Sequence, residues 1–328
     1  MVQAGTWRRG VWIAVAIFVA GGVPVAQGQS GGGNRADGAL VAKAEPGGGP
    51  LYQVHSDLVL VPVTVTANGG RAIGGLTEKN FRVFEDRVEQ NIANFTPEQA
   101  AATVGLVLDC SDSMGPKLAK AQAAVRAVLQ RALPGDEFFF IRFSHTPELA
   151  VSLTTDVARV RQALATTQVS GNTAVLDAVK MAWDQMRGAH SVRKAVVLIS
   201  DGEDNSSRIT PEDFRQLAMQ SDTSIYSLFI GERPDPIQSP RWNKSRGPGL
   251  LDDIARQTGG RMFVVSNLKQ LPLISAEIGS WIRSQYVVGY IPRKETPGYR
   301  RIEVRVVKPA GSPKLHLNRR RGYAVPGT

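Results

Sequence analysis

The chain has 328 residues, of which 42% are hydrophobic, and a formal net charge of +10. This length is enough for two domains with hydrophobic cores, and the composition excludes a wholly disordered chain. The single cysteine, Cys110, excludes an internal disulfide, and the four histidines are too scattered along the sequence to form a zinc site with it.

Residues 1–28 have the three parts of a secretory signal peptide. Two arginines precede an apolar segment at 11–20, and the small residues Ala26 and Gly28, at alternate positions, provide a cleavage site. The apolar segment is shorter than the roughly 20 residues that a membrane-spanning helix needs, so we expect a cleaved signal and a periplasmic or secreted protein. An uncleaved signal anchor is the alternative. Residues 29–51, rich in Gly and Ala, are expected to be a flexible linker.

Strand patterns lie on both sides of the central part of the chain. Residues 52–98 contain an alternating β-branched segment that begins at Asp57, and two short strands that begin at Asn80 and Gln90. Three more strands are expected in residues 285–328. Neither segment has enough strands to close a sandwich alone, so we expect the two to pack together into one small β-sandwich-like module.

Residues 99–284 alternate between strand and helix patterns. Strands are expected at 137–143, 194–200, 224–230 and 261–265, helices at 117–133, 156–166, 175–186, 250–258 and 268–283, and a long polar loop at 232–249. Thr210 and Pro211, followed by two acids, begin another helix. This alternation predicts an α/β fold with a doubly wound, mostly parallel, Rossmann-like sheet. The domain would be inserted in, or flanked by, the β-module.

The stretch from Val104 to Met114 (VGLVLDCSDSM) contains the most informative pattern. An apolar strand ends at Asp109, and Ser111 and Ser113 follow at alternate positions. Open α/β folds bind their ligands at the carboxyl ends of their strands. A carboxylate and two hydroxyls there are the oxygen ligands that hard cations such as Mg²⁺ prefer, although the same residues could simply cap the loop and the next helix.

Two later segments extend this pattern. Thr173 comes just before a helix, and Asp201 ends a second apolar strand and is followed by Gly202. In this order the residues resemble the metal-ion-dependent adhesion site of the von Willebrand factor type A family, which reads Asp-x-Ser-x-Ser, then Thr, then Asp-Gly. All five positions match, and they are Asp109, Ser111, Ser113, Thr173 and Asp201.

The resemblance implies a divalent cation at these five residues, some of which would act through water. It also implies that a carboxylate of a partner protein completes the coordination of the ion. Mg²⁺ is the expected ion, and Mn²⁺ and Ca²⁺ are alternatives because all three accept oxygen ligands. The Tyr-x-x-Gly-Tyr segment at 286–290 and Arg-Gly-Tyr at 321–323 are similar to a bacterial exported subgroup with flanking β-segments, of the Acidobacterial type.

We therefore expect an exported, metal-ion-dependent protein-binding module, and not an enzyme. One alternative is a structural envelope scaffold with an inert metal site. Another is a Mg²⁺-dependent hydrolase with Asp109 as nucleophile, for which Asp112 is poorly spaced as the general acid. Residues 293–321 carry ten Lys and Arg against two Glu. This charge suits a solvated strand face or a weak contact with an anionic envelope surface, and we expect no specific nucleic-acid partner.

Three further expectations concern the surroundings of the site. Cys110 should be a buried structural residue and not a reactive thiol. Asp112, Glu203 and Asp204 should be solvated loop acids, in preference to a second metal site. The helix at 268–283 runs directly into the second part of the β-module, so we expect it to transmit occupancy of the metal site to the flanking strands.

Overall fold

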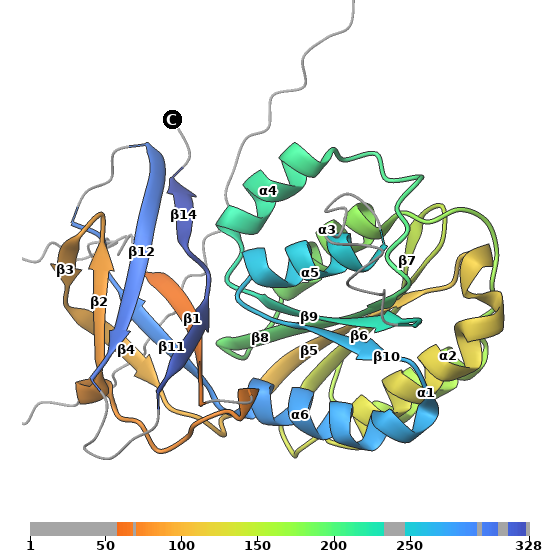
Figure 1. Ribbon diagram of the computed structural model, residues 1–328, viewed down its shortest axis with the longest axis horizontal. Helices are drawn as coiled ribbons and strands as arrows, with labels where there is room; N and C mark the ends of the chain where they lie inside the picture. The colour runs from red at the N-terminus through yellow and green to blue at the C-terminus, as the bar shows by residue number, and fades with distance from the viewer. Residues whose placement is uncertain (1–57, 68–69, 233–246, 294–296, 308–313, 326–328) are drawn as a thin grey trace, which may run out of the picture. The chain divides into compact units, whose positions relative to one another are not determined.

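The computed structural model describes residues 58–67, 70–232, 247–293, 297–307 and 314–325. The expected signal peptide, linker and first residues of the β-module lie outside these ranges, as does most of the expected 232–249 loop. The described residues belong to one unit, residues 55–328. Figure 1 shows that this unit contains an α/β domain and, beside it, two further β-sheets.

A six-stranded sheet is the middle layer of the α/β domain. Its strands are β5 (Ala102–Asp109), β6 (Glu137–Phe143), β7 (Pro147–Thr154), β8 (Arg193–Ser200), β9 (Ser224–Ile230) and β10 (Met262–Val265). Their order is β10-β9-β8-β5-β6-β7, and every neighbouring pair is parallel except β6 and β7. The chain moves to one side of β5 for β6 and to the other for β8, so a topological switch point lies between β5 and β8. The predicted fold class is confirmed.

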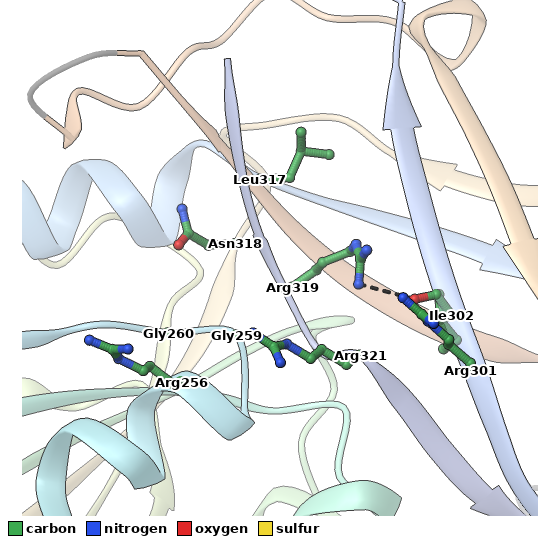
Figure 2. A pocket seen from close by; sticks show the side chains of 9 residues that line it. All are labelled: Arg256, Gly259, Gly260, Arg301, Ile302, Leu317, Asn318, Arg319 and Arg321. Carbon is green, nitrogen blue, oxygen red and sulfur yellow. Dashed lines mark hydrogen bonds between the residues drawn. The ribbon is translucent and has the colours of Figure 1, made fainter. Parts of the chain in front are cut away.

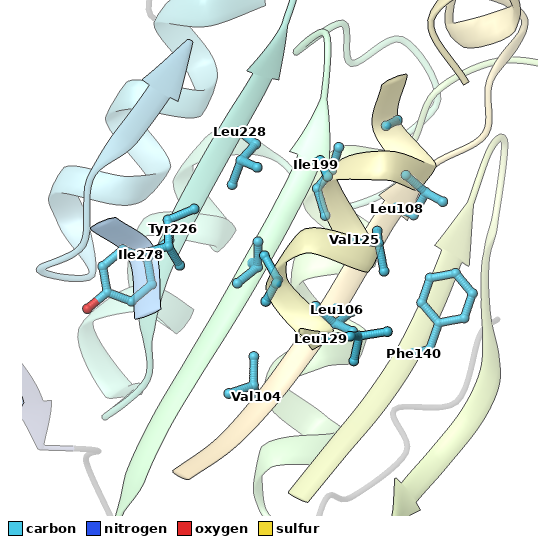
Figure 3. Close-up of a cluster of buried hydrophobic side chains, with 14 of the residues drawn as sticks. Val104, Leu106, Leu108, Val125, Leu129, Phe140, Ile199, Tyr226, Leu228 and Ile278 are labelled. Carbon is cyan, nitrogen blue, oxygen red and sulfur yellow. The ribbon is translucent and has the colours of Figure 1, made fainter. Parts of the chain in front are cut away.

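Among the described residues, six α-helices cover this sheet, three on each face (Figure 1). One face carries α1 (Leu118–Leu129), α2 (Val157–Ala165) and α6 (Leu271–Arg283), and the other carries α3 (Val175–Met186), α4 (Pro211–Gln220) and α5 (Gly247–Gln257). Leu106 and Leu108 of β5 belong to the first core (Figure 3), and Val107 belongs to the second. Gly105 leaves room for the ring of Phe139, because a Cβ there would lie 2.2 Å from a ring atom.

The other strands of the described part form two four-stranded sheets. One contains β1 (Val59–Thr66), β4 (Ile92–Thr96), β11 (Gln285–Tyr290) and β13 (His316–Arg319), and the other contains β2 (Phe81–Glu85), β3 (Val88–Gln90), β12 (Gly298–Val306) and β14 (Gly322–Val325). Each sheet pairs strands from before the α/β domain with strands from after it, as β1 pairs with β11 and β2 with β12. The sheets share a core that includes Val61, Val83, Val288 and Val304, as in a small sandwich.

Three of the expected helices begin or end differently in the structure, and one of them is α5, which begins at Gly247 and not at residue 250. The helix expected at 117–133 is a 3-10 turn, Asp112–Lys117, followed by α1, which ends at Leu129. Pro134 disfavours helical geometry at the residue before it, which prevents the helix from continuing through this segment. The helix expected at 268–283 also begins as a 3-10 turn, Leu268–Gln270, and a third 3-10 turn, Glu78–Asn80, precedes β2.

Three strands were missed in the sequence: β3, β7 and β14, the last of which is a fourth strand in residues 285–328, where three were expected. β7 alternates apolar and polar residues but begins with Pro147, which is tolerated there because β7 is an edge strand. β3 follows β2 through a tight turn in which Asp86 and Arg87 both have positive φ, at 46° and 73°. Two consecutive positive φ angles are typical of a hairpin turn, and this turn lacks the glycine that usually reveals one.

A buried arginine joins the two places where the chain passes between the sandwich and the α/β domain. The Arg193 guanidinium donates hydrogen bonds to the carbonyl of Ala100, to that of Pro97 at 2.7 Å and to that of Gln285 at 2.9 Å. The first two carbonyls belong to the link between β4 and β5, and Gln285 begins β11. One side chain therefore fixes both connections. None of the described helices has the length and apolar character needed to cross a bilayer.

Candidate metal centre

Asp109 is the residue of the site whose side chain is held most firmly in place by hydrogen bonds. It is the last residue of β5 and is fully buried. Its Oδ1 accepts hydrogen bonds from the N–H (2.9 Å) and the hydroxyl (2.7 Å) of Ser111, and its Oδ2 accepts one from the Ser200 hydroxyl at 2.6 Å. Ser200 ends the neighbouring strand β8 and accepts a hydrogen bond from the N–H of Gly202. Groups from the ends of two adjacent strands therefore hold the carboxylate in one orientation.

The two serines of the motif lie together beside this carboxylate. The Ser111 and Ser113 hydroxyl oxygens are 3.2 Å apart. Ser111 is buried, and Ser113 is half-buried in the 3-10 turn that starts at Asp112. The structure thus brings the first three predicted ligands into one hydrogen-bonded group.

Thr173 lies in a loop that is tied to both other motif loops. Its N–H donates to the Asn205 side chain at 2.8 Å, and its carbonyl accepts from the N–H groups of Asn205 and Ser206 at 2.9 Å. Two residues earlier, Gly171 exchanges hydrogen bonds with Asp112, donating to its side chain at 3.0 Å and accepting from its N–H at 2.9 Å. Main-chain bonds therefore connect the three segments that carry the predicted ligands.

Asp201 is buried at the end of β8 and has a partner that the sequence analysis did not consider. The ammonium group of Lys117 lies 2.7 Å from its Oδ2, and the Lys117 side chain is 33% exposed. Lys117 is one turn beyond Ser113, at the end of the 3-10 turn. A positively charged side chain therefore lies directly beside the second carboxylate of the site.

The electrostatics of the site favour a bound cation. Burial raises the pKa of Asp109 to about 6, the hydrogen bonds from Ser200 and Ser111 oppose this shift, and the charge of Asp201 adds to it. A buried carboxylate close to a second carboxylate is stabilised by a nearby positive charge. Once an ion displaces Lys117 from Asp201, two carboxylates and neutral hydroxyl oxygens would balance the charge of one divalent ion and leave it room for a further ligand. These residues therefore fit a divalent cation of the Mg²⁺ type.

Ser200 and Lys117 are the site residues that sequence reasoning missed. Ser200 shows a weak signal, a hydroxyl at the end of an apolar strand immediately before Asp201. Lys117 also shows a weak signal. A cation at the start of a helix is unfavourable unless an anion lies nearby, so its position suggests an acidic partner. Both roles depend on neighbours that are distant in sequence.

One of the three nearby acids is not the solvated loop residue that was expected. Asp204 is half-buried, accepts hydrogen bonds from the N–H of Val175 (3.1 Å) and the hydroxyl of Ser207 (2.6 Å), and has its pKa raised by burial. It satisfies a free N–H group at the start of α3, which such helix ends require. Asp112 is exposed but binds the Thr173 loop, and Glu203 is exposed.

Cys110 lies between two ligands but points into the core. It is buried, and its thiol donates to the Leu108 carbonyl at 3.4 Å. Burial, with a contribution from the charge of Asp109, raises the pKa of this thiol to about 12. A thiol of this kind stays protonated and unreactive at neutral pH, as expected for a structural residue.

A cavity of about 570 Å³ opens beside Asp201. Lys117, Glu203, Asn205, Phe229 and Pro248 are among the residues that line it. It is large enough to admit the side chains of another molecule to the edge of the site.

Replacing Lys117 with methionine should tighten Mg²⁺ or Mn²⁺ binding by roughly five- to tenfold, since a partly exposed ion pair contributes about 1 kcal/mol. The ammonium group occupies one side of Asp201 and repels an incoming dication, whereas methionine keeps the bulk of the side chain without the charge. Calorimetric titration of both proteins measures the difference. Lys180→Met, which removes an exposed lysine paired with Asp184 on α3, is the control and should bind as the wild type does. Equal affinities for Lys117→Met and wild type would show that Lys117 does not compete with the ion for Asp201.

Comparison with known proteins supports the assignment of the domain. The family model of the von Willebrand factor type A domain matches residues 104–203. An uncharacterized protein of Borreliella burgdorferi is 23% identical over 188 residues, which cover 51% of this chain and 55% of that protein, so the match spans little more than half of the relative.

Two solved structures illustrate the range of similar proteins. A von Willebrand factor type A protein from Catenulispora acidiphila is 14% identical with a TM-score of 0.48, covering 82% of this chain and 75% of that chain. Proximal thread matrix protein 1 from the mussel byssus, with a zinc-occupied MIDAS motif, is 18% identical with a TM-score of 0.45, covering 60% of this chain and 48% of that chain.

The predicted family is confirmed by the match to its model. All five predicted ligand positions lie within the matched segment, at the ends of β5 and β8 and in the loop before α3. Residues 104–203 of this chain therefore match the von Willebrand factor type A domain.

Proposed function

We propose that this chain is a divalent-cation-dependent protein-binding module that acts outside the cytoplasm. In this proposal Asp109, Ser111, Ser113, Thr173 and Asp201 hold the ion, directly or through water, and a carboxylate of a partner protein completes its coordination. The observation that carries the proposal is the buried Asp109 carboxylate, oriented by Ser111 and Ser200 at the switch point of the sheet. The signal-peptide pattern of residues 1–28 supports an exported location.

The charge of the site explains why a carboxylate partner fits. A bound dication would supply an electrophilic centre. The two protein carboxylates would balance its charge of +2 without adding excess negative charge. Neutral hydroxyl ligands leave the ion attractive to a third carboxylate, and the cavity beside Asp201 gives that group a route of approach. Mg²⁺ is the ion we propose, with Mn²⁺ and Ca²⁺ able to use the same oxygen ligands.

Binding fits this geometry better than hydrolysis does. Both oxygens of Asp109 are engaged by hydroxyl or N–H donors, and the side chain is fully buried, which keeps it from attacking a substrate as a nucleophile. Asp112, the nearest acid in sequence, accepts a hydrogen bond from the N–H of Gly171. We therefore propose a binding protein and not an enzyme.

The test is metal binding by the purified protein, measured by calorimetry and by thermal shift. We expect one Mg²⁺ or Mn²⁺ site in the wild type, no detectable binding in Asp109→Ala, and affinity at least tenfold weaker in Ser111→Ala. Asp184→Ala, which removes an exposed carboxylate on α3, should bind as the wild type does. Far-UV circular dichroism of each variant separates loss of binding from loss of folding.

The outcomes distinguish the alternatives. A wild type that binds no ion at millimolar concentration would favour the inert scaffold, and equal binding by Asp109→Ala would remove this carboxylate from the site. If the ion binds as expected, a partner captured by the wild type should be released by a chelator and recovered when Mg²⁺ is restored.

A further inference from the structure

A pocket of about 380 Å³ lies away from the metal centre and has basic walls (Figure 2). Arginines from three segments line it: Arg256 at the end of α5, Arg301 on β12, and Arg319 and Arg321 at the turn between β13 and β14. The adjoining Gly259 and Gly260 precede β10 and so mark the amino edge of the parallel sheet. Asp109 and Asp201 lie at its carboxyl edge, so the two sites are separate.

The turn between β13 and β14, which carries Arg319, Arg320 and Arg321, is held in place by hydrogen bonds of its buried middle residue. Arg320 is only 6% exposed and donates hydrogen bonds to the Leu60 carbonyl at 2.6 Å and the Ser221 carbonyl at 3.1 Å. Because this middle arginine points into the protein, its neighbours Arg319 and Arg321 are left to line the pocket. In Figure 2 Arg321 extends toward Gly259 and Arg256, whereas Arg319 lies beside Ile302 and Arg301.

The wall of the pocket formed by Gly259 and Gly260 lies close to this turn because Gly259 has no side chain. Gly259 has a φ of +81°, and a Cβ on it would come within 2.9 Å of the Arg319 backbone. Two main-chain segments therefore touch at the base of the pocket. The spacing of the arginines is set by backbone contacts and not only by flexible side chains.

The positive charge in the pocket is largely uncompensated. No acidic residue lines it within the described ranges, and the side chains of Arg301 and Arg321 make no hydrogen bond or ion pair with a described residue. Arg319 donates to two carbonyls, those of Ile302 (3.0 Å) and Arg320 (3.2 Å). Arg256 pairs with Asp252, but this arginine is 75% exposed and can move.

The arginines also repel one another. The pKa of Arg319 is lowered by burial. The charge of Glu303 opposes this shift, and the charges of Arg321 and Arg301 add to it. Glu303 itself is bound to Arg305 at 2.7 Å. A bound anion would relieve this repulsion, because opposite charge favours the charged form of each guanidinium.

We propose that this pocket binds a phosphate group, carried either by a small molecule or by the headgroup of an anionic phospholipid. Guanidinium groups present paired donors that match the oxygens of a phosphate, and arginine is the residue best suited to such recognition. The pocket volume is within the range of small-molecule sites and accepts a phosphate with its first substituent. The site is independent of the metal centre and of the protein-binding function proposed above.

The test uses a pair of double variants that remove equal charge. Arg301→Gln/Arg321→Gln removes the two pocket arginines that have no described partner, and Arg82→Gln/Arg187→Gln removes two exposed arginines outside the pocket. Inorganic phosphate and pyrophosphate are titrated into each protein at constant ionic strength, with thermal shift and calorimetry as readouts. We expect saturable millimolar or tighter binding by the wild type and the control, and at least fivefold weaker binding by the pocket variant.

A parallel arm identifies the source of the phosphate. Sedimentation with phosphatidylglycerol vesicles, compared with phosphatidylcholine vesicles, should show binding that the pocket variant loses if the ligand is a headgroup, and no pocket-dependent binding if it is a small molecule. Equal loss in both double variants would indicate general charge attraction and overturn the proposal. So would the absence of saturable binding to phosphate, pyrophosphate and anionic vesicles.

Discussion

Replacing Arg193 with methionine should lower the free energy of unfolding by about 2–3 kcal/mol. Three carbonyls lose hydrogen bonds from a charged donor, and removal of a buried charge offsets part of this loss. The Arg193 residue is completely buried, and its guanidinium is bound by the carbonyls of Pro97, Ala100 and Gln285. Methionine fills a similar volume but donates no hydrogen bond. Three carbonyls, of which that of Gln285 is buried, would then lose a partner at the same place.

The loss should appear first at the two connections between the sandwich and the α/β domain. Amide hydrogen exchange at residues 97–101 and 284–290 should accelerate more than exchange in the middle of β8, because the arginine binds the former segments directly. Arg193→Lys keeps the charge but cannot reach three carbonyls with one ammonium group, so we expect an intermediate loss of stability.

Arg215→Met is the matched control for this experiment. Arg215 pairs with Glu212 on the surface of α4, where both side chains are about half exposed or more. Such pairs contribute little, so its unfolding free energy should stay within about 0.5 kcal/mol of the wild type. A change of less than about 1 kcal/mol for Arg193→Met, measured by urea unfolding, would show that water or other donors replace the guanidinium.

The metal-site residues could be predicted from sequence because they lie in local patterns. Apolar runs ending in Asp109 and Asp201 predict buried strands, and parallel strands place their carboxyl ends on one edge. The contacts of Ser200 and Lys117 depend on which strands are neighbours and on the path of a 3-10 turn. No local pattern in the sequence specifies either.

The basic C-terminal segment shows a similar limit. Its charge suggested a solvated face, but Arg300 and Arg320 are buried while their neighbours Arg301 and Arg321 are exposed. Alternation along β12 indicates that one arginine of the first pair faces inward, but Arg320 and Arg321 lie in the turn between β13 and β14, to which this alternation does not apply. It does not indicate that Gly259, from the α/β domain, contacts this turn and closes a pocket.

Transmission of metal occupancy through α6, which is joined to β11 by Ser284, stays a prediction.

Replacing Asp136 with alanine should have an effect comparable to that of Arg193→Met, a loss of about 3–5 kcal/mol, because it breaks a buried ion pair and leaves one charge without its partner. The Asp136 side chain is 0% exposed and binds Arg283 at the end of α6. It also accepts hydrogen bonds from the N–H groups of Leu133 (2.8 Å) and Ala102 (3.1 Å). Alanine removes all of these acceptors, and equilibrium urea unfolding measures the loss.

A double-mutant cycle separates the ion pair from the two N–H bonds. Arg283→Met removes the charge that Asp136 neutralises, so Asp136→Ala should be less damaging in that background, by at least 1 kcal/mol of coupling. In the Asp136→Ala single variant, by contrast, Arg283 is unpaired and its charge acts on Arg193. The pKa of Arg193 is already lowered, first by burial and next by the charge of Arg283. Additive effects of the two substitutions would show that Asp136 acts through Leu133 and Ala102 alone. A coupled result would mean that Asp136, Arg283 and Arg193 form one network, in which the same charges stabilise the α/β domain and its junction with the sandwich.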